Sequence, residues 1–228
     1  MKVFLERPEE NRENREKFFL RQGIDAGRVV SAEIVHGTKV EIITFQKYTD
    51  KRRPSLIGIS SFGVVRQVIP GTDALVTKEK NVFLSITVAD CLPIFFYDPV
   101  ARVIGIAHAG WRGLAGGVLE NTLAALRVPP EEVLVWLGPA IGPHAFEVGP
   151  EVRQAFLEGH AEAAVAFVPS VNAGRFMADL YALARLRLAA SGVRSVHGGG
   201  FCTYSDPRFY SYRRNARTGR FASLVWLV

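Results

Sequence analysis

The stretch TVADCLPIFFYDPVARVIGIAHAGWRG, residues 87–113, contains two apolar segments on either side of a short polar turn. Residues 92–97 (LPIFFY) and 102–107 (RVIGIA) are rich in the β-branched and aromatic residues that favour strands. The turn between them, DPVA at 98–101, has proline at its second position, as type I turns favour. This stretch therefore predicts an antiparallel β-hairpin in the middle of the chain.

The predicted hairpin brings two reactive side chains together. If the turn is a two-residue loop, Cys91 lies directly opposite His108, with Cβ atoms roughly 4.5–5.5 Å apart. That spacing allows a thiolate and an imidazole to share one metal ion, and it equally allows a Cys–His nucleophile pair. The prediction depends on register, because a slip of one residue sends one side chain to the other face. Pro93 also favours an edge or irregular strand beside Cys91.

The residues after His108 favour an anion site. Gly110 and Gly113 allow close backbone approach, and a helix predicted over 114–126 offers free N–H groups and the positive end of its dipole. Arg112 adds a fork of donors that suits phosphate. The plainer interpretation is that these glycines only serve a strand-to-helix turn, and the segment alone leaves both open.

Other candidate residues are ambiguous when taken singly. His36 lies between apolar residues just before a glycine turn, where a histidine is more often structural than a ligand. His144 lies in a Gly/Pro loop and is a candidate for lining a pocket. Asp90 either points away from Cys91 or anchors a backbone turn, and Cys202 reads as a small buried thiol.

The alternation of short apolar segments and helical patterns predicts an α+β fold. We expect one domain over residues 1–228, with mixed β-sheets flanked by helices, because strands and helices do not alternate strictly. The predicted strands cover 40–45, 56–60, 63–69, 82–88, 133–138, 193–200, 209–214 and 221–228. The predicted helices cover 8–22, 114–126, 151–158 and 176–190.

Composition narrows the class of protein. The 228 residues are 48% hydrophobic, but no apolar run is long enough to span a membrane, and the charged N-terminus lacks a signal-peptide pattern. We therefore expect a cytoplasmic protein, in which two cysteines cannot form a disulfide framework. The net charge of +6 favours an anionic ligand. Because the basic clusters at 51–53 and 213–214 are short, we expect a small anion and no nucleic acid.

Several motifs together resemble one known family. They are VHGTKV (35–40), DALVT (73–77), ADCLPIFFYDP (89–99), IGIAHAGWRG (104–113), GPAIGPHAFEVG (138–149) and CTYSDPRFYSYRRNARTGRFASLVWL (202–227). With these, the chain resembles the YfiH-type proteins, long called polyphenol oxidases or multicopper laccases. The resemblance runs from about residue 33 to the C-terminus. The chain departs from the common family pattern at Ile34, where a glutamine is frequent, and at His144, where some members carry cysteine.

The resemblance implies a zinc enzyme acting on purine nucleosides. It implies zinc ligands at His36, Cys91 and His108, and an α+β fold distantly similar to toxin deamidases that use a Cys–His pair. The implied substrates are phosphate with adenosine, inosine, guanosine or methylthioadenosine, and adenosine deamination is also implied. Zinc is expected rather than copper, with Cys91, His108 and Arg112 in catalytic roles. The expected phosphate- or substrate-binding residues are Gly110, Arg112, Gly113, His144, Arg213 and Arg214.

Three other functions compete with this one. A laccase needs four coppers, and five histidines without an H-x-H pair, plus two cysteines, suit that poorly. A metal-free cysteine hydrolase would use Cys91 as nucleophile and His108 as base, with no need of His36. A structural zinc module would require a fourth protein ligand, for which the sequence offers no clear candidate. The usual H-x-E and P-C-x-x-C deaminase signature is absent.

Overall fold

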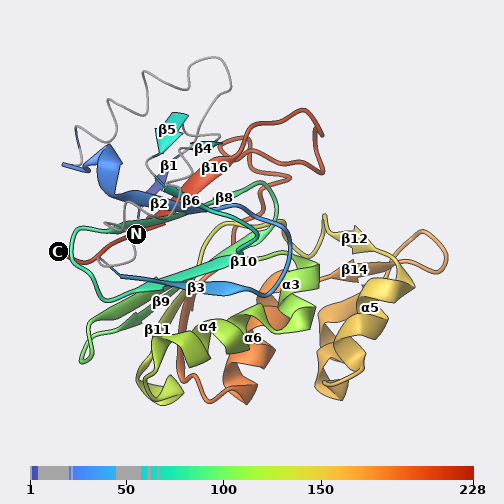
Figure 1. Cartoon of the computed structure of the whole chain (residues 1–228). Coiled ribbons are helices and arrows are strands. Elements are labelled where there is room, and N and C mark those ends of the chain that lie inside the picture. The colour runs from blue at the N-terminus through green and yellow to red at the C-terminus, as the bar shows by residue number, and fades with distance from the viewer. Residues whose placement is uncertain (1, 5–20, 22, 45–57, 61–62, 66) are drawn as a thin grey trace.

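The computed structural model describes residues 2–4, 21, 23–44, 58–60, 63–65 and 67–228 (Figure 1). The charged helix expected over 8–22 lies almost entirely outside these residues. Mixed parallel and antiparallel sheets with packed helices confirm the α+β class. Among the described residues, no helix combines the length and apolar character needed to cross a membrane.

Short strands alternate irregularly with helices along the chain. The strands are β1 (Lys2–Phe4), β2 (Val29–Ala32), β3 (Val40–Ile43), β4 (Gly58–Ser60), β5 (Gly63–Val65), β6 (Gln67–Ile69), β7 (Ala74–Thr77), β8 (Phe83–Val88), β9 (Leu92–Asp98), β10 (Val103–Ala109), β11 (Leu134–Leu137), β12 (Glu147–Val148), β13 (Phe167–Pro169), β14 (Phe176–Ala178), β15 (Ser195–Gly198) and β16 (Phe221–Val225). The α-helices are α3 (Trp111–Gly116), α4 (Val118–Leu126), α5 (Pro150–Leu157) and α6 (Leu180–Ala190). The 3-10 helices are η2 (Ala26–Arg28), η3 (Pro130–Glu132) and η4 (Ala161–Ala166).

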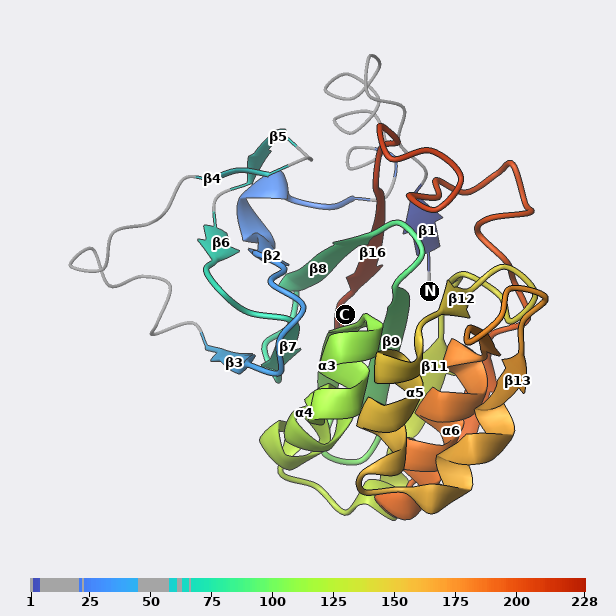
Figure 2. The ribbon, with the colours of Figure 1, turned by 90° about the vertical axis from the view of Figure 1, so that its right-hand side faces the viewer.

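Two sheets and a helical layer stack on one another (Figures 1 and 2). The five-stranded sheet has the order β1-β16-β8-β2-β6, and the six-stranded sheet has the order β15-β11-β9-β10-β7-β3; β12-β14-β13 and β4-β5 form two smaller sheets. Alternate residues of β9 and β10 face opposite ways, so one apolar cluster forms against α4 and α6 and a second forms between the sheets. On β10, Ile104 and Ile106 point between the sheets, and His108 continues the same row. The reactive histidine therefore lies where the inter-sheet core ends.

The predicted hairpin is present, but its register differs from the expected one. Asp98 pairs with Val103, so the connection has four residues instead of two, and His108 pairs with Pro93 instead of Cys91. The Asp98 carboxylate accepts hydrogen bonds from the backbone N–H groups of residues 100 and 101, and Arg102 then takes a left-handed φ of 50°. The two additional loop residues shift the strand pairing by two positions. Because a shift of two preserves the face of each side chain, Cys91 and His108 still point into the same space.

Three predicted elements have different boundaries or types. The helix expected over 114–126 is two helices, because Gly117 adopts φ 100° between α3 and α4. The helix expected over 176–190 begins at Leu180, where the Asp179 carboxylate caps the N-terminus, and residues 176–178 form β14. Residues 209–214 were expected to form a strand but form turns.

Removing a fully buried side chain from the inter-sheet core should destabilise the protein strongly. Ile106 has no exposed surface, so Ile106→Ala should lower the free energy of unfolding by about 2–5 kcal/mol in a denaturant titration. Val100, in the hairpin loop, is 83% exposed, and Val100→Ala should change stability by less than about 0.5 kcal/mol. Equal effects of the two substitutions would contradict this arrangement of the layers.

Candidate metal centre

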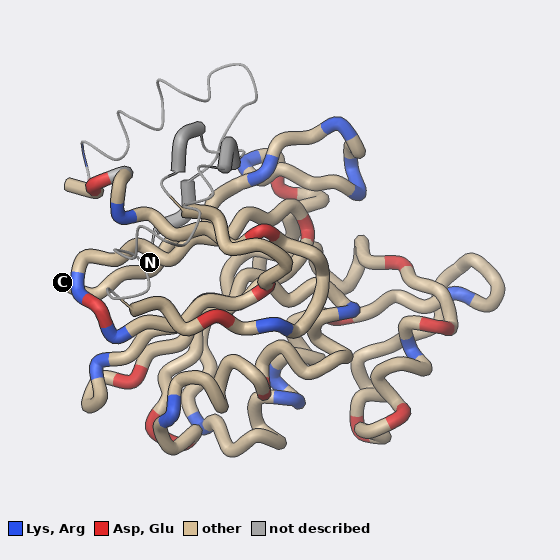
Figure 3. The backbone as a smooth tube through the Cα atoms, viewed as in Figure 1, with Lys and Arg blue, Asp and Glu red and all other residues tan. Residues whose placement is uncertain are grey.

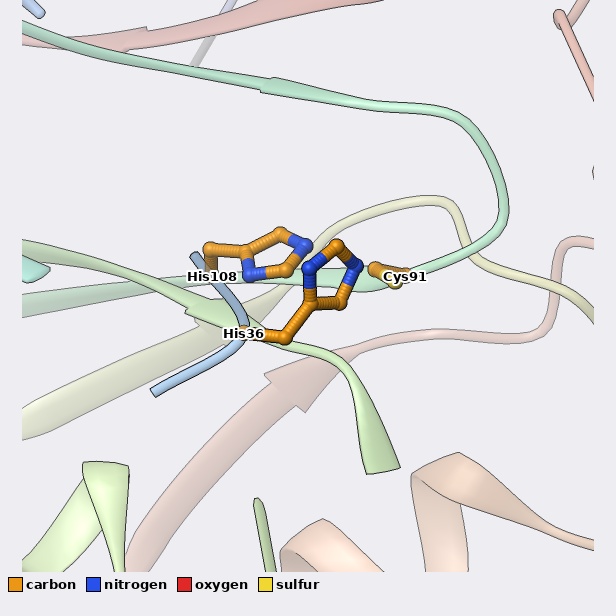
Figure 4. A group of neighbouring side chains, drawn as sticks. All are labelled: His36, Cys91 and His108. Carbon is orange, nitrogen blue, oxygen red and sulfur yellow. The ribbon is translucent and has the colours of Figure 1, made fainter. Parts of the chain in front are cut away.

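Three metal-binding side chains converge at the end of the inter-sheet core (Figure 4). His36 comes from the loop between β2 and β3, Cys91 precedes β9, and His108 lies near the end of β10. One donor atom from each lies within 4.8 Å of the other two, and the two imidazole rings meet edge to face at 4.9 Å. Ligand atoms around a tetrahedral zinc are about 3.3–3.8 Å apart, so small side-chain movements bring all three onto one ion.

The buried carboxylate of Asp73 holds two of the three candidate ligands in place. It accepts hydrogen bonds from the backbone N–H groups of Val35 (3.3 Å), His36 (2.9 Å) and Gly37 (2.8 Å). It also bonds Nδ1 of His108 at 3.0 Å, which directs Nε2 of that ring toward the site. Carboxylate–histidine pairs of this kind fix the ring orientation of metal ligands. Asp73 therefore links the His36 loop to β10.

The backbone of His36 supports a functional role for its side chain. His36 adopts a left-handed φ of 60°, which is uncommon for a residue other than glycine. Strained conformations of this kind cost about 1–3 kcal/mol and persist where surrounding contacts impose them. Here the contacts with Asp73 impose the conformation, and it turns the imidazole toward Cys91 and His108.

Two glycines make room for this assembly. A Cβ atom on Gly110 would lie 3.1 Å from both Sγ of Cys91 and Cδ2 of His36, in the space between the ligands. A Cβ atom on Gly113 would lie 2.7 Å from the carbonyl oxygen of Gly37, which closes against α3. Both glycines, expected to bind phosphate, therefore have a packing role that involves the His36 loop and the ligand cluster.

The cluster changes the ionisation of its own members. Burial disfavours the Cys91 thiolate, but hydrogen bonds from His108 and His36 outweigh it and lower the pKa of Cys91 to about 6. Burial likewise disfavours charged His108, but the bonds to Asp73 and Cys91 dominate and raise the pKa of His108 to about 9. Between these values the metal-free pair is a thiolate and an imidazolium. Such a pair suits either metal capture with loss of the imidazolium proton or nucleophilic attack by sulfur.

A pocket of about 570 Å³ opens over the three ligands. Its apolar wall comes from Ile34, Val88, Ile141 and Phe146. Its charged lining residues, apart from the ligands, are Asp90, Arg213 and Arg220. This volume and this mixture of apolar wall and few polar groups are typical of sites for small organic ligands.

Asp90 ties the pocket to the candidate ligand Cys91. Its φ is 85°, and its two carboxylate oxygens accept hydrogen bonds from Thr203 Oγ1 (2.6 Å) and from the backbone N–H of Arg213 (2.7 Å). Its carbonyl accepts a bond from the N–H of Ile141 at 3.0 Å. Of the two orientations open for Asp90, the structure shows the one that anchors backbone turns.

Of the six expected phosphate- or substrate-binding residues, only Arg213 lines this pocket; Gly110, Arg112, Gly113, His144 and Arg214 lie outside its lining. Arg112 is exposed, with its guanidinium 4.4 Å from the centre of the Trp111 ring. His144 is exposed on its loop. Arg214 donates hydrogen bonds to the carbonyl of Thr203 (2.8 Å) and to neighbouring carbonyls, so it stabilises the C-terminal loop. Cys202 accepts a hydrogen bond from the backbone of the 142 loop and is half-buried.

Two residues of the site were missed by sequence reasoning. Asp73 stands directly before the buried strand β7 within the DALVT motif, and a carboxylate at that position was a usable signal. Arg220 is one of five arginines between residues 208 and 220, and the sequence does not distinguish it from the others.

The Cys91 thiol of the metal-free protein should react as an anion at unusually low pH. Because its pKa is about 6, alkylation by iodoacetamide should reach half its maximal rate near pH 6 and stay high above it. The rate can be followed by mass spectrometry of the Cys91 peptide, which separates it from Cys202. His108→Gln should move the midpoint upward, because the thiolate loses its strongest stabilising partner. A midpoint above pH 8 in the unsubstituted protein would contradict the described cluster.

Loss of the Asp73 carboxylate should weaken metal binding. Asp73→Asn should lower zinc affinity about 10–100-fold, measured by competition with a chelator, because the His108 ring and the His36 loop lose their common acceptor. Glu162→Gln is the matched control, since Glu162 also bonds a histidine, His160, at 3.1 Å but on the surface. Unchanged zinc affinity in folded Asp73→Asn, verified by circular dichroism, would refute this role.

Known proteins match the chain over most of its length. A family model described as multi-copper polyphenol oxidoreductase laccase matches residues 4–228. A purine nucleoside phosphorylase of Pseudomonas aeruginosa is 65% identical over 156 residues, which cover 68% of this chain and 64% of that protein. The purine nucleoside phosphorylase YfiH of Escherichia coli is 40% identical over 222 residues, covering 97% of this chain and 82% of YfiH.

Solved structures share the same fold. A Neisseria meningitidis protein matches with a TM-score of 0.79 and 43% identity, over 94% of this chain and 79% of that chain. The YfiH protein of Bacillus licheniformis matches with a TM-score of 0.81 and 28% identity, over 95% of this chain and 80% of that chain. The chain therefore belongs to the YfiH-type family, whose family model carries the laccase description.

Proposed function

We propose that this chain is a zinc-dependent purine nucleoside phosphorylase acting on adenosine, inosine, guanosine and methylthioadenosine. The observation that carries the proposal is the convergence of His36, Cys91 and His108 at the floor of a 570 Å³ pocket that also holds two arginines. Relatives named as purine nucleoside phosphorylases support the same reaction.

The donor set suits zinc. Two imidazoles and one thiolate are ligands that zinc prefers, and three protein ligands leave the open position typical of catalytic sites. Zinc bound there would act as a Lewis acid on a substrate oxygen or a water molecule. A fourth protein ligand is not part of the cluster among the described residues, which disfavours a purely structural zinc module.

Two imidazoles and a thiolate also form the core of blue-copper sites, which usually add a weakly bound methionine. Met177 belongs to β14 and does not line the pocket, and Met1 lies outside the described residues. A laccase needs a further group of copper ligands, and the described residues contain no second cluster of three or more metal-binding side chains. The remaining histidines, His144, His160 and His197, lie outside this cluster. We therefore prefer zinc over a set of coppers.

In the proposed reaction, a phosphate oxygen forms a bond to C1′ of the ribose while the C1′–N9 bond breaks. The bonding electrons and the phosphate proton leave with the purine, which gives the free base and ribose 1-phosphate. The apolar wall, including Ile141 and Phe146, offers surface for the purine, and the arginines attract the anionic nucleophile. The pocket's own residues would thus hold the two substrates next to each other.

A metal-free hydrolase would need only Cys91 and His108. Such a pair has no use for His36, yet His36 is held in a strained backbone conformation that turns it to the same point. This favours three ligands over a two-residue nucleophile. Adenosine deamination is proposed as a second reaction of the same site, because zinc held by His36, Cys91 and His108 would activate water, which would replace the C6 amino group of adenosine and release ammonia.

Purified protein should convert inosine and phosphate into hypoxanthine and ribose 1-phosphate, and adenosine in part into inosine. Cys91→Ser and His36→Ala should each lower kcat/KM about 100-fold or more, because each removes a ligand. His160→Ala, a surface change, should keep full activity. Metal analysis should find about one zinc per chain. No base released with phosphate present would sink the proposal, and about four coppers with phenol oxidation would favour laccase.

A further inference from the structure

Two unpaired arginines line the pocket beside the metal ligands. Arg213 and Arg220 belong to the C-terminal loop before β16, a basic segment visible as blue tube in Figure 3. In the described part of the chain, neither guanidinium lies within 4.0 Å of a carboxylate, whereas Arg187 and Arg208 each form such a pair. The charge of Arg220 is therefore available to a ligand, and that of Arg213 is shared only with a longer-range electrostatic interaction that helps to lower the pKa of Glu147.

Each of the two guanidinium groups is held by contacts that leave donors free. Arg213 donates from Nη1 to the carbonyl of Glu147 at 3.0 Å and lies 5.5 Å from the Phe146 ring centre. Arg220 donates from Nη1 to the carbonyls of its own loop and lies 5.6 Å from the Tyr212 ring centre. The Nε and Nη2 groups remain without a described acceptor in both residues. A planar, oriented fork of this kind suits the oxygens of a tetrahedral anion.

The charge of the pocket favours an anion. Asp90 is the only carboxylate among its described lining residues, and both Asp90 oxygens already accept hydrogen bonds from Thr203 and from the N–H of Arg213. Asp90 therefore does not neutralise either guanidinium through a direct side-chain contact. The two guanidinium groups are positively charged, and the oxygens of the one carboxylate are already hydrogen-bonded to other groups. The pocket therefore favours a negatively charged ligand.

The site expected after His108 is less suitable for phosphate. Helix α3 has only six residues, Arg112 rests on Trp111, and Gly113 packs against the carbonyl of Gly37. None of Arg112, Gly110 and Gly113 lines the pocket. The arginines that do line the pocket come instead from the C-terminal loop.

We propose that Arg213 and Arg220 bind the inorganic phosphate consumed in phosphorolysis, and that Arg220 is the principal determinant of phosphate affinity. This inference rests on the proposed function and assigns its second substrate to two named residues. Arg220 is the sharper probe, because the Arg213 guanidinium also tethers its loop to the carbonyls of Ala145 and Glu147, whereas the half-buried Arg220 side chain donates only to its own loop.

The test measures phosphate binding to the zinc-loaded protein by calorimetry, together with steady-state kinetics. Arg220→Gln should weaken inorganic phosphate binding at least about 10-fold and raise the KM for phosphate similarly, with the KM for inosine changed less than about threefold. Arg220→Lys keeps the charge but loses the planar fork of donors, so its phosphate affinity should lie between those of the unsubstituted protein and Arg220→Gln. Arg217→Gln, an exposed arginine of the same loop outside the pocket lining, should bind phosphate normally.

The following results with substituted proteins would overturn the proposal. They are unchanged phosphate affinity in Arg220→Gln, an equal loss in Arg217→Gln, and a loss in Arg112→Gln that exceeds the loss in Arg220→Gln. Adenosine 5′-monophosphate is a second probe, because it carries a phosphate group on a nucleotide. If the protein binds this nucleotide through Arg220 but does not bind inorganic phosphate, the proposal is also overturned. If phosphate binding depends on Arg220 but the unsubstituted protein releases no base, the anion site stands and the proposed phosphorolysis fails.

Discussion

The buried carboxylate of Asp73 is the interaction on which the site depends. It joins the backbone of residues 35–37 to the imidazole of His108, and so fixes two potential ligands that are 72 positions apart in the chain. A carboxylate without exposed surface is costly to bury unless it is fully hydrogen-bonded, and here three N–H groups and one ring nitrogen satisfy it. The same bonds impose the strained backbone of His36.

The remaining parts of the site are positioned by the two-sheet core and by Asp90. Strand β10 carries Ile104, Ile106 and His108 on one face, so the packing of the sheets sets the depth of the histidine. Asp90, next to Cys91, holds Thr203 and the backbone of Arg213, which brings the C-terminal loop over the ligands. The pocket therefore combines a rigid floor made by strands with a wall of turns that carries the positive charge.

The sequence predicted the α+β class, the hairpin and the meeting of Cys91 with His108, because these depend on local periodicity and turn chemistry. The predicted register was wrong, because the four-residue turn moves the pairing by two positions. Cys91 and His108 still lie close together, because a shift of two keeps both side chains on one face. His36 entered only through family resemblance, because its position depends on a non-local bond to Asp73. The choice among the arginines also required the structure. Arg213 and Arg220 line the pocket, whereas Arg112 and Arg214 make other contacts. No sequence motif distinguishes Arg220 from the arginines around it.

X-ray absorption at the zinc edge of the metal-loaded protein tests the central claim most directly, because it reports the ligand atoms themselves. One sulfur near about 2.3 Å and nitrogen or oxygen ligands near about 2.0–2.1 Å are expected for a site made of Cys91, His36 and His108. Cys91→Ser should remove the sulfur shell, and Cys202→Ser should leave it unchanged. A spectrum of the unsubstituted protein without a sulfur ligand, or with a shell that persists in Cys91→Ser, would contradict the account.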